Sequence, residues 1–188
     1  MTTRLDLVAH APSSATRAAR FPDDEGIEAS SVVALEALGG KQRLYGRVLT
    51  APACAARNTA AALGFDADVD MALRECDYGR WRSLALTEVA LREPDDFEAW
   101  FADPAAAPHG GESLAALIER AGAWLAESLA RDGATLAVTH ASVVRAAIVS
   151  ALGAGPSFFW RISMSRRCRS RGSAVARDAG ILWRWGLG

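Results

Sequence analysis

Three short, largely apolar runs, each followed by a loop and then by a segment of helix length, constrain the fold of this chain most strongly. They span residues 5–8, 47–50 and 135–139. Short apolar runs of this kind are typical of strands that are covered on both faces of a parallel sheet. Units of strand, loop and helix in series therefore predict an α/β fold, a three-layer sandwich with a mostly parallel central sheet and helices on both faces.

The segments between the expected strands have the marks of helices. Residues 113–129 are the clearest case, because their apolar residues recur at helical spacing. Glycine and proline end or divide the others, which we predict at residues 27–38, 53–63, 84–92, 95–101 and 142–152. The chain of 188 residues shows no internal repeat and no domain boundary, so we expect residues 1–188 to form a single domain.

Charge and cysteine usage exclude several classes of function. The formal net charge of −1 gives no field that would attract nucleic acid or anionic lipid, and we expect neither as a partner. Residues 136–152 are too short and too polar to span a bilayer, and the N-terminus lacks the apolar stretch of a signal peptide. The three cysteines, Cys54, Cys76 and Cys168, are scattered and fit neither a disulfide framework nor a metal site. We therefore expect a cytoplasmic protein without metal or other cofactor, and the sequence carries no signal for an oligomeric state.

Two histidines occupy equivalent places in the predicted sheet. His10 follows the first apolar run and His140 follows the third. Ligand sites of open parallel sheets lie beyond the carboxyl ends of the strands, so the two imidazoles can converge there. Either histidine alone would more simply cap a strand or pack in the core. Because the chain has only three histidines and two share this context, the pair indicates a functional site.

Five segments of the chain carry recognisable motifs, and they follow one another between residues 4 and 160. They are Ala9-His10-Ala11, residues 50–60, residues 75–81, Gly111-Glu112-Ser113 and Val138-Thr139-His140. In this order they resemble the motifs of the histidine phosphatase superfamily, also called phosphoglycerate-mutase-like. That family has Arg-His-Gly, Ser-Pro…Arg-Ala-x-x-Thr-Ala, Glu-x-x-Phe/Tyr-Gly-x-Trp, Gly-Glu-Ser and a strand that ends in a second histidine. Each motif is weak alone, but five in order favour a small bacterial phosphatase of this family with a degenerate first motif.

The resemblance implies a chemistry for three residues. His10 would be the nucleophile that forms a phosphohistidine. Glu75 would be the general acid that protonates the leaving group and then the base that activates water. His140 would donate hydrogen bonds to the phosphoryl oxygens as charge develops. The implied substrate is a small phosphate ester, and the implied reaction needs no metal.

Two arginines that hold phosphate in the family are replaced here by Ala9 and Ala55. Loss of a charge-assisted contact costs a few kcal/mol, so other residues must compensate if the protein is active. The candidates are Thr16 and Arg17 in the loop after His10, and Arg57 on the helix of Ala55. Arg17 and Arg57 could equally be solvated surface side chains, and Arg20 fits that description better than it fits a phosphate site.

These departures keep a second function open. The leading hypothesis is a metal-independent phosphatase of small phosphate esters. The alternative is a catalytically weak or inactive family member that binds a phosphorylated ligand, and it is motivated by Ala9 and Ala55. A mutase is less favoured, because the chain is short for one.

The remaining features have structural explanations. Trp81, Trp100 and Trp124 are expected in the core or in a pocket wall. His109 lies in a linker rich in proline and glycine and is expected to be solvated, and Glu112 is expected to serve the start of the helix that follows it.

The C-terminal segment is unusual because residues 161–171 contain five arginines. A nucleic-acid patch and a disordered basic tail are two explanations. The third is better motivated: residues 163–169, back-translated with GC-rich codons and read in a shifted frame, give the Asp-Val-Ala-Pro-Leu-Ser strand of related proteins. Residues 163–188 would then be an aberrant, frameshifted tail, and one strand of the sheet would be missing or poorly replaced.

Overall fold

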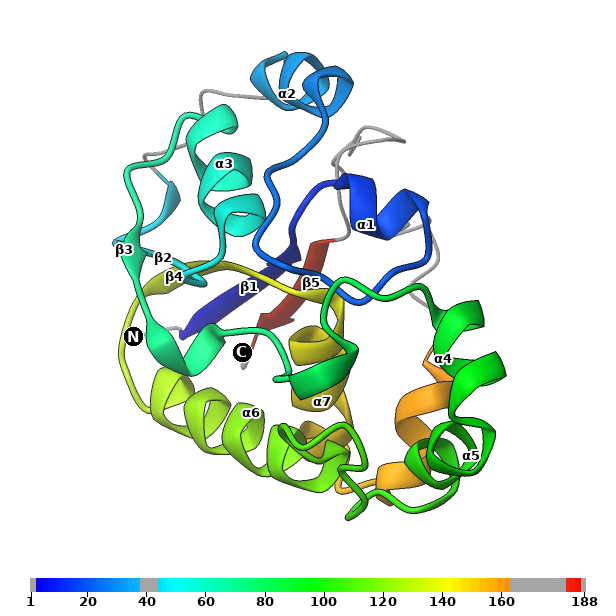
Figure 1. Ribbon diagram of the computed structural model, residues 1–188. Helices are drawn as coiled ribbons and strands as arrows, with labels where there is room; N and C mark the ends of the chain where they lie inside the picture. Colours follow the sequence, from blue (N-terminus) through cyan, green and yellow to red (C-terminus); the bar gives the residue numbers. More distant parts are fainter. Residues whose placement is uncertain (1–2, 38–43, 163–181, 187–188) are drawn as a thin grey trace.

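The computed structural model describes residues 3–37, 44–162 and 182–186, and a five-stranded sheet forms its centre (Figure 1). The strand order is β3-β2-β4-β1-β5, in which β5 runs antiparallel to β1 and the other pairs are parallel. The strands are β1 (Arg4–Ala9), β2 (Arg47–Thr50), β3 (Asp68–Val69), β4 (Ala134–Thr139) and β5 (Leu182–Gly186). The three predicted strands are confirmed as β1, β2 and β4.

The two central strands are buried along nearly their whole length. In β1 and β4 only the first residue of each is partly exposed, as expected for strands that are covered on both faces. They pair in parallel, with Leu5 opposite Thr135 and Ala9 opposite Thr139. Both strands therefore end at the same level, and the residues that follow them leave the sheet side by side.

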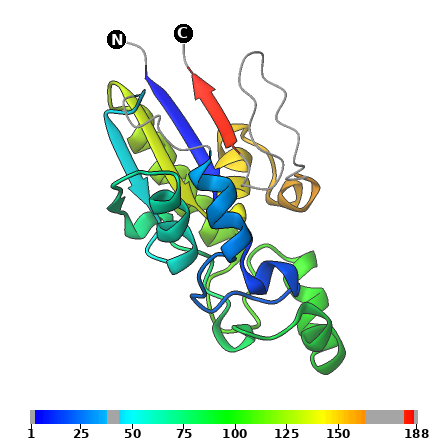
Figure 2. The same ribbon diagram turned by 90° about the horizontal axis from the view of Figure 1, so that it is seen from above.

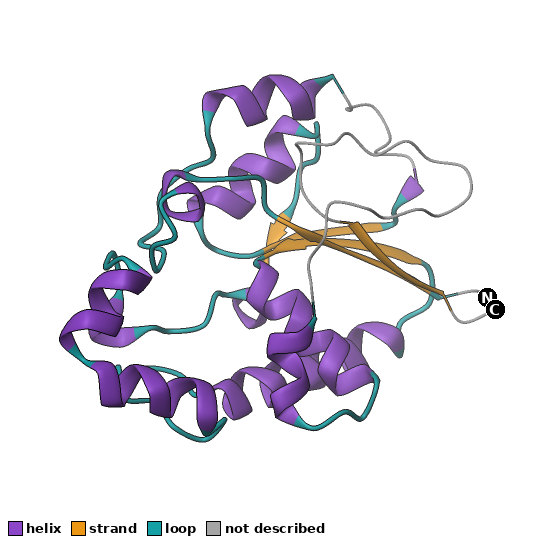
Figure 3. Ribbon diagram, turned by 90° about the vertical axis from the view of Figure 1, so that its right-hand side faces the viewer, coloured by secondary structure: helices purple, strands orange, loops and turns teal. Residues whose placement is uncertain are grey.

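Helices cover both faces of the sheet, which confirms the three-layer architecture (Figure 3). On one face lie α2 (Ala29–Glu36) and α3 (Cys54–Ala62), and on the other α6 (Leu114–Leu129) and α7 (Ala141–Ala151). The long helix α6 begins at Ser113, whose side chain accepts a hydrogen bond from the Ala116 N–H. None of the helices in the described ranges is long and apolar enough to cross a bilayer.

Several of the remaining short helices, coloured blue and green, lie beyond the carboxyl ends of the parallel strands (Figure 2). A second, aromatic core lies in this part of the molecule, and Phe21, Trp81 and Trp100 are buried in it. Trp124 is buried in the main core, so all three tryptophans lie where we predicted them. The short elements are α1 (Ser14–Arg17), η2 (Met71–Leu73), η3 (Gly79–Trp81), α4 (Leu86–Arg92), α5 (Pro94–Ala102) and η4 (Pro156–Arg161).

The predicted exposure of His109 is wrong. The side chain is 1% exposed, its ring lies 5.1 Å from that of Trp81, and its Nδ1 accepts a hydrogen bond from the Gly111 N–H. The backbone around His109 packs directly on the 75–81 loop, and a Cβ atom at Gly79 would lie 2.1 Å from the His109 carbonyl oxygen. The linker is therefore part of the support of that loop, which its proline and glycine content does not reveal.

The expectation for Glu112 is also wrong. Its carboxylate accepts two hydrogen bonds from the Arg120 guanidinium, at 2.8 and 2.6 Å, and Ser113 caps the helix instead. A bidentate guanidinium contact is charge-assisted at both partners and is therefore among the stronger hydrogen-bonded pairs.

Most of the arginine-rich segment lies outside the described residues, as does the segment whose codons suggest a frameshift. The frameshift therefore stays a prediction. Strand β5, within the suspected tail, occupies the sheet edge beside β1.

Candidate active site

The ends of β1 and β4 bring His10 and His140 together. The His10 N–H donates to the Thr139 carbonyl at 2.8 Å, which continues the parallel ladder by one residue. The two imidazole centroids lie 5.0 Å apart, with the rings edge to face. Residues 130 positions apart in the chain thus form one site, through the strand register alone.

The surroundings of His10 fix its proton arrangement. Its Nδ1 lies 2.8 Å from the Ala11 carbonyl oxygen. A carbonyl oxygen only accepts, so Nδ1 carries the proton and Nε2 keeps its lone pair in the neutral ring. Burial and the neighbouring charge of His140 lower the pKa of His10 below its usual value. At neutral pH His10 is therefore a neutral imidazole whose Nε2 can act as a nucleophile.

Glu75 lies in the loop between η2 and η3, and its carboxylate is held by several donors. Oε2 lies 3.2 Å from His140 Nδ1, and Oε1 accepts hydrogen bonds from the Ser142 hydroxyl and, at 2.8 Å, from the Cys76 N–H. Burial alone would raise the pKa of Glu75, but His140 and these donors outweigh it and lower the pKa to about 2. Glu75 is therefore ionised in the unliganded site at neutral pH.

His140 is the N-cap residue of α7 and is almost fully buried, at 2% exposure. Its Nε2 has no hydrogen-bond partner among the described residues. Free backbone N–H groups at the start of an eleven-residue helix favour an anion nearby. His140 and the start of α7 together offer donors to a negatively charged group next to His10.

The predicted phosphate-binding residues have other contacts. Thr16 is exposed on α1 and its hydroxyl lies 3.2 Å from Ser13 Oγ. Arg17 is ion-paired with Glu28, and its side chain is 64% exposed. Arg57 is exposed on α3, with Nη2 3.5 Å from Cys54 Sγ. The structure thus groups the three predicted catalytic residues tightly, whereas it places the three predicted phosphate ligands on the surface of α1 and α3.

Carboxylates occupy part of the neighbourhood where a phosphate pocket is expected. Asp24 accepts a hydrogen bond from the Cys54 N–H at 2.6 Å, at the start of α3. Glu25 accepts from the Ala15 N–H at 3.1 Å. Ala9 and Ala55, which replace the family arginines, are each only 5% exposed. This side of the site therefore carries fewer positive groups than the family pattern implies.

A cavity of about 370 Å³ opens in front of Glu75 and His140, and we call it the mouth cavity. Its wall includes Arg74 and Arg82, which lie in none of the predicted site positions. Arg74 is ion-paired with Glu112 at 3.6 Å, and Arg82 with Asp77 at 3.3 Å. The sequence around Arg74 and Arg82 contains no pattern that distinguishes either of them from an ordinary exposed arginine. Among the described residues, no group of three or more His, Cys, Asp or Glu side chains has an arrangement that would hold a metal ion.

Comparison with protein families gives one match over most of the chain. A model described as the histidine phosphatase superfamily (branch 1) matches residues 34–180. The matched region begins after His10, so the segment with the altered first motif lies outside it.

Two kinds of curated relative share about a third of their aligned residues with this chain. A bifunctional protein of Mycobacterium tuberculosis is 32% identical over 125 residues, which are 65% of this chain and 32% of that protein. A glucosyl-3-phosphoglycerate phosphatase of Mycobacterium tuberculosis is 33% identical over 106 residues, which are 54% of this chain and 47% of that protein. The match thus spans about a third of the first relative and about half of the second.

Solved structures share the fold. A mycobacterial glucosyl-3-phosphoglycerate phosphatase in complex with VO3 superposes with a TM-score of 0.72 at 24% identity, over 86% of this chain and 87% of that one. A phosphoserine phosphatase of Entamoeba histolytica in complex with 3-phosphoglyceric acid gives a TM-score of 0.74 at 15% identity, over 86% and 85% of the two chains.

Proposed function

Because this chain belongs to the histidine phosphatase superfamily (branch 1), we propose that it is a metal-independent phosphatase that hydrolyses small phosphate esters through a phosphohistidine on His10. The observation that carries the proposal is the state of His10. Its Nδ1 proton is held by the Ala11 carbonyl, its Nε2 is free to attack, and its lowered pKa keeps it neutral at pH 7.

In the first step, His10 Nε2 forms a bond to phosphorus and the bond between phosphorus and the ester oxygen breaks. The leaving alkoxide takes a proton from Glu75. Glu75 must therefore be protonated when the ester is bound, although its pKa is low in the unliganded site. The negative charge of the phosphate favours this change, because a like charge beside a carboxylate raises its pKa.

In the second step, the Glu75 carboxylate takes a proton from water, and the resulting hydroxide forms a bond to phosphorus. The bond between phosphorus and His10 Nε2 breaks, and inorganic phosphate leaves. His140 Nε2 and the start of α7 stabilise the equatorial oxygens throughout. Donors that are fixed before the substrate arrives cost no reorganisation during the reaction.

Two further parts of the proposal concern the ligand and the compartment. A relative that acts on a phosphorylated glycerate derivative supports a small phosphorylated substrate, not nucleic acid or membrane. Cys54 and Cys76 are free thiols, which fits a location in the reducing cytoplasm.

A binding module without turnover is the second candidate. It is supported by the buried Ala9 and Ala55 and by the Asp24 carboxylate at the start of α3. A phosphorylated ligand would then rest on His140 and the α7 N-terminus, and His10 would not be phosphorylated.

Hydrolysis of p-nitrophenyl phosphate by wild type and by His10→Ala separates the two candidates. We expect turnover by the wild type, equal with and without a chelator, and none by His10→Ala with an unchanged melting temperature. Rapid acid-free quenching after labelled substrate should leave a base-stable, acid-labile phosphate on His10. A label on serine or cysteine, or a strict metal requirement, would contradict the mechanism, and binding without any label would favour the binding module.

A further inference from the structure

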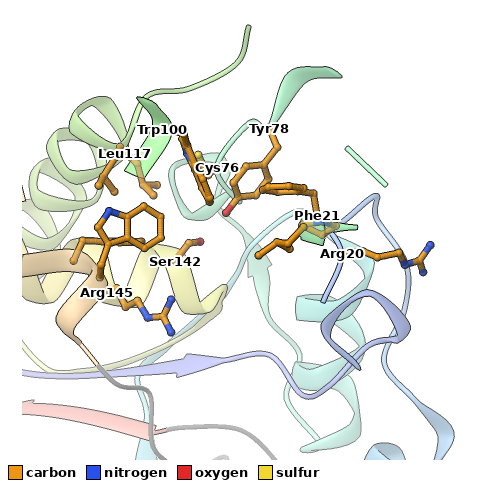
Figure 4. A pocket seen from close by; sticks show the side chains of 13 residues that line it. Arg20, Phe21, Cys76, Tyr78, Trp100, Leu117, Ser142 and Arg145 are labelled. Atoms are coloured by element: carbon orange, nitrogen blue, oxygen red, sulfur yellow. The ribbon is translucent and has the colours of Figure 1, made fainter. Parts of the chain in front are cut away.

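A second pocket adjoins the mouth cavity, and we call it the side pocket (Figure 4). Its volume is about 200 Å³, and Pro22, Cys76 and Tyr78 line both spaces. Ser142, in the wall of the side pocket, donates its hydroxyl proton to the Glu75 carboxylate. The side pocket therefore begins on the far side of the residue that is proposed to protonate the leaving group.

The position of the side pocket next to Glu75 relates it to the leaving group of the substrate. The leaving oxygen of a bound ester must lie within reach of Glu75, since Glu75 supplies its proton. The rest of the leaving group then extends past Glu75 into the space bounded by Cys76, Tyr78 and Ser142. A volume of about 200 Å³ lies below the usual range for drug-sized ligands, so the leaving group must be small.

The walls of the side pocket are mainly apolar, and five of the lining residues are aromatic. The rings of Phe21 and Tyr78 lie 4.8 Å apart and those of Trp100 and Trp160 5.0 Å apart, and Phe159 is the fifth aromatic residue. Such walls favour a flat or apolar ligand body, because its burial removes apolar surface from water.

Arg145 places a positive charge in this apolar wall. It lies on α7 one turn after Ser142, so both side chains emerge on the same side of the helix (Figure 4). Its guanidinium carbon lies 5.8 Å from the Phe159 ring centroid, and its Nε is buried without a hydrogen-bond partner. No ion pair to Arg145 is formed within the described part of the chain. Arg20 also lines the pocket, but it is exposed at the rim and its side chain points away in Figure 4.

A partly buried arginine without an ion pair is costly, because the guanidinium has lost part of its hydration. Burial lowers the pKa of Arg145 by more than the nearby Tyr78 and Glu75 groups raise it, so these two groups offset the cost only in part. A ligand carboxylate would offset that cost, since its two oxygens match the paired N–H groups of a guanidinium. The aromatic residues in the walls thus favour a ligand with an apolar body, and the guanidinium of Arg145 favours a carboxylate on that ligand.

We propose that the side pocket binds the leaving group of the substrate and that Arg145 pairs with a carboxylate on it. The substrates are then phosphate esters of small, aromatic or apolar hydroxy acids. This inference rests on the proposed function for the orientation of the ester, but ligand binding tests it without turnover.

The binding test compares phenylacetate with phenylacetamide, which has nearly the same shape and no charge. Binding is followed through the fluorescence of the indoles that line the pocket. We expect the wild type to bind the carboxylate at least about tenfold more tightly, which corresponds to about 1.4 kcal/mol. Arg145→Met should remove this preference, and the charge-matched control Arg20→Met should keep it.

Equal affinities for the two probes in the wild type would overturn the proposal without any variant. A preference that survives in Arg145→Met, or that Arg20→Met removes equally, would also contradict it. Should Arg145→Met fail to fold, Arg145→Lys keeps the charge but loses the paired N–H groups, and we expect it to weaken the preference about threefold or more.

Turnover separates this inference from the proposed function. In the wild type, kcat/KM for 4-carboxyphenyl phosphate should be about tenfold higher than kcat/KM for phenyl phosphate. In Arg145→Met the two values should be nearly equal. A carboxylate preference in binding without any turnover would refute the phosphatase and leave the side pocket supported. Turnover of both esters with no preference in either assay would refute the side pocket and leave the phosphatase supported.

Discussion

The candidate site has two halves, which differ in how their side chains are held. We call the half that contains His10, Glu75 and His140 the well-built half, and the half expected to bind phosphate the phosphate-holding half. His10 and His140 are held by the ends of buried strands, and Glu75 is held by a loop that packs closely on the segment around the buried His109. Thr16 and Arg17, by contrast, lie exposed on a four-residue helix, where Arg17 is engaged by Glu28. The groups proposed to make and break bonds are thus positioned by the core, whereas the groups expected to hold phosphate lie on the surface.

The difference separates two requirements of the reaction. A nucleophile and an acid must be placed to within a fraction of an ångström, which only a rigid scaffold supplies. Charge on the phosphate can be balanced from several directions, although less well from solvent-exposed side chains. This chain brings His10, Glu75 and His140 together, whereas Ala9 and Ala55 stand where the resemblance to the family implies arginines. Activity that is slow but His10-dependent is the outcome that this comparison predicts.

The largest expected effect concerns Glu75 in the well-built half. Glu75→Gln keeps the size of the side chain but has no proton to give, so hydrolysis of an alkyl phosphate should fall by roughly 10²–10⁴-fold. On p-nitrophenyl phosphate, whose leaving group needs no proton, the loss should be much smaller. Steady-state rates on the two esters provide the measurement. Equal losses on both would remove Glu75 from the acid role.

The next effect is on stability and also concerns Glu75. Its pKa is about 2 in the folded protein and near 4.5 when unfolded, so the folded state is stabilised above pH 4.5. This stabilisation is lost as pH falls through 4.5 towards 2, and its full size is roughly 3 kcal/mol. Urea unfolding of wild type and Glu75→Gln at several pH values measures it. The free energy of unfolding of the variant should lack this decrease between pH 4.5 and 2.

His10 provides an internal control for that titration. Its pKa is lowered from 6.5, so the unfolded chain takes up its proton first and destabilisation begins just below pH 6.5. Destabilisation from His10 therefore begins at a higher pH than destabilisation from Glu75, which begins near pH 4.5, and this decrease below pH 6.5 should still be seen in Glu75→Gln. An identical pH profile in both proteins would mean that Glu75 is not held ionised by His140.

Much of the well-built half could be predicted from sequence. Two apolar strands that are each followed by a histidine are sufficient to place His10 beside His140, because parallel pairing aligns the ends of neighbouring strands. His109 was missed because its burial depends on close contact with Gly79 and Gly111, and local sequence does not encode which loop packs on a linker. Arg145 left a weak signal: a charged residue within an otherwise apolar helix, three positions after Ser142 and five after His140.

The next prediction concerns a positive charge added beside the nucleophile, in the place of Ala9. Ala9→Arg restores a donor next to the nucleophile, at a residue that is 5% exposed. One charge-assisted contact to the phosphate should raise kcat/KM about tenfold, or about 1.4 kcal/mol. Ala9→Met, which adds similar bulk without charge, is the matched control and should give no gain. An equal gain in both variants would mean that packing, not charge, limits the site.

The smallest expected effect concerns Arg17, which should contribute weakly because it is 64% exposed and paired with Glu28. An exposed charge contributes up to about 1 kcal/mol, so Arg17→Ala should lower kcat/KM less than about fivefold. Arg92→Ala removes a similarly exposed charge, ion-paired with Glu88 on α4, and should leave kcat/KM unchanged. A loss of several hundredfold in Arg17→Ala would show that Arg17 leaves Glu28 to hold the phosphate, and the phosphate-holding half would then be as well built as the half that contains His10.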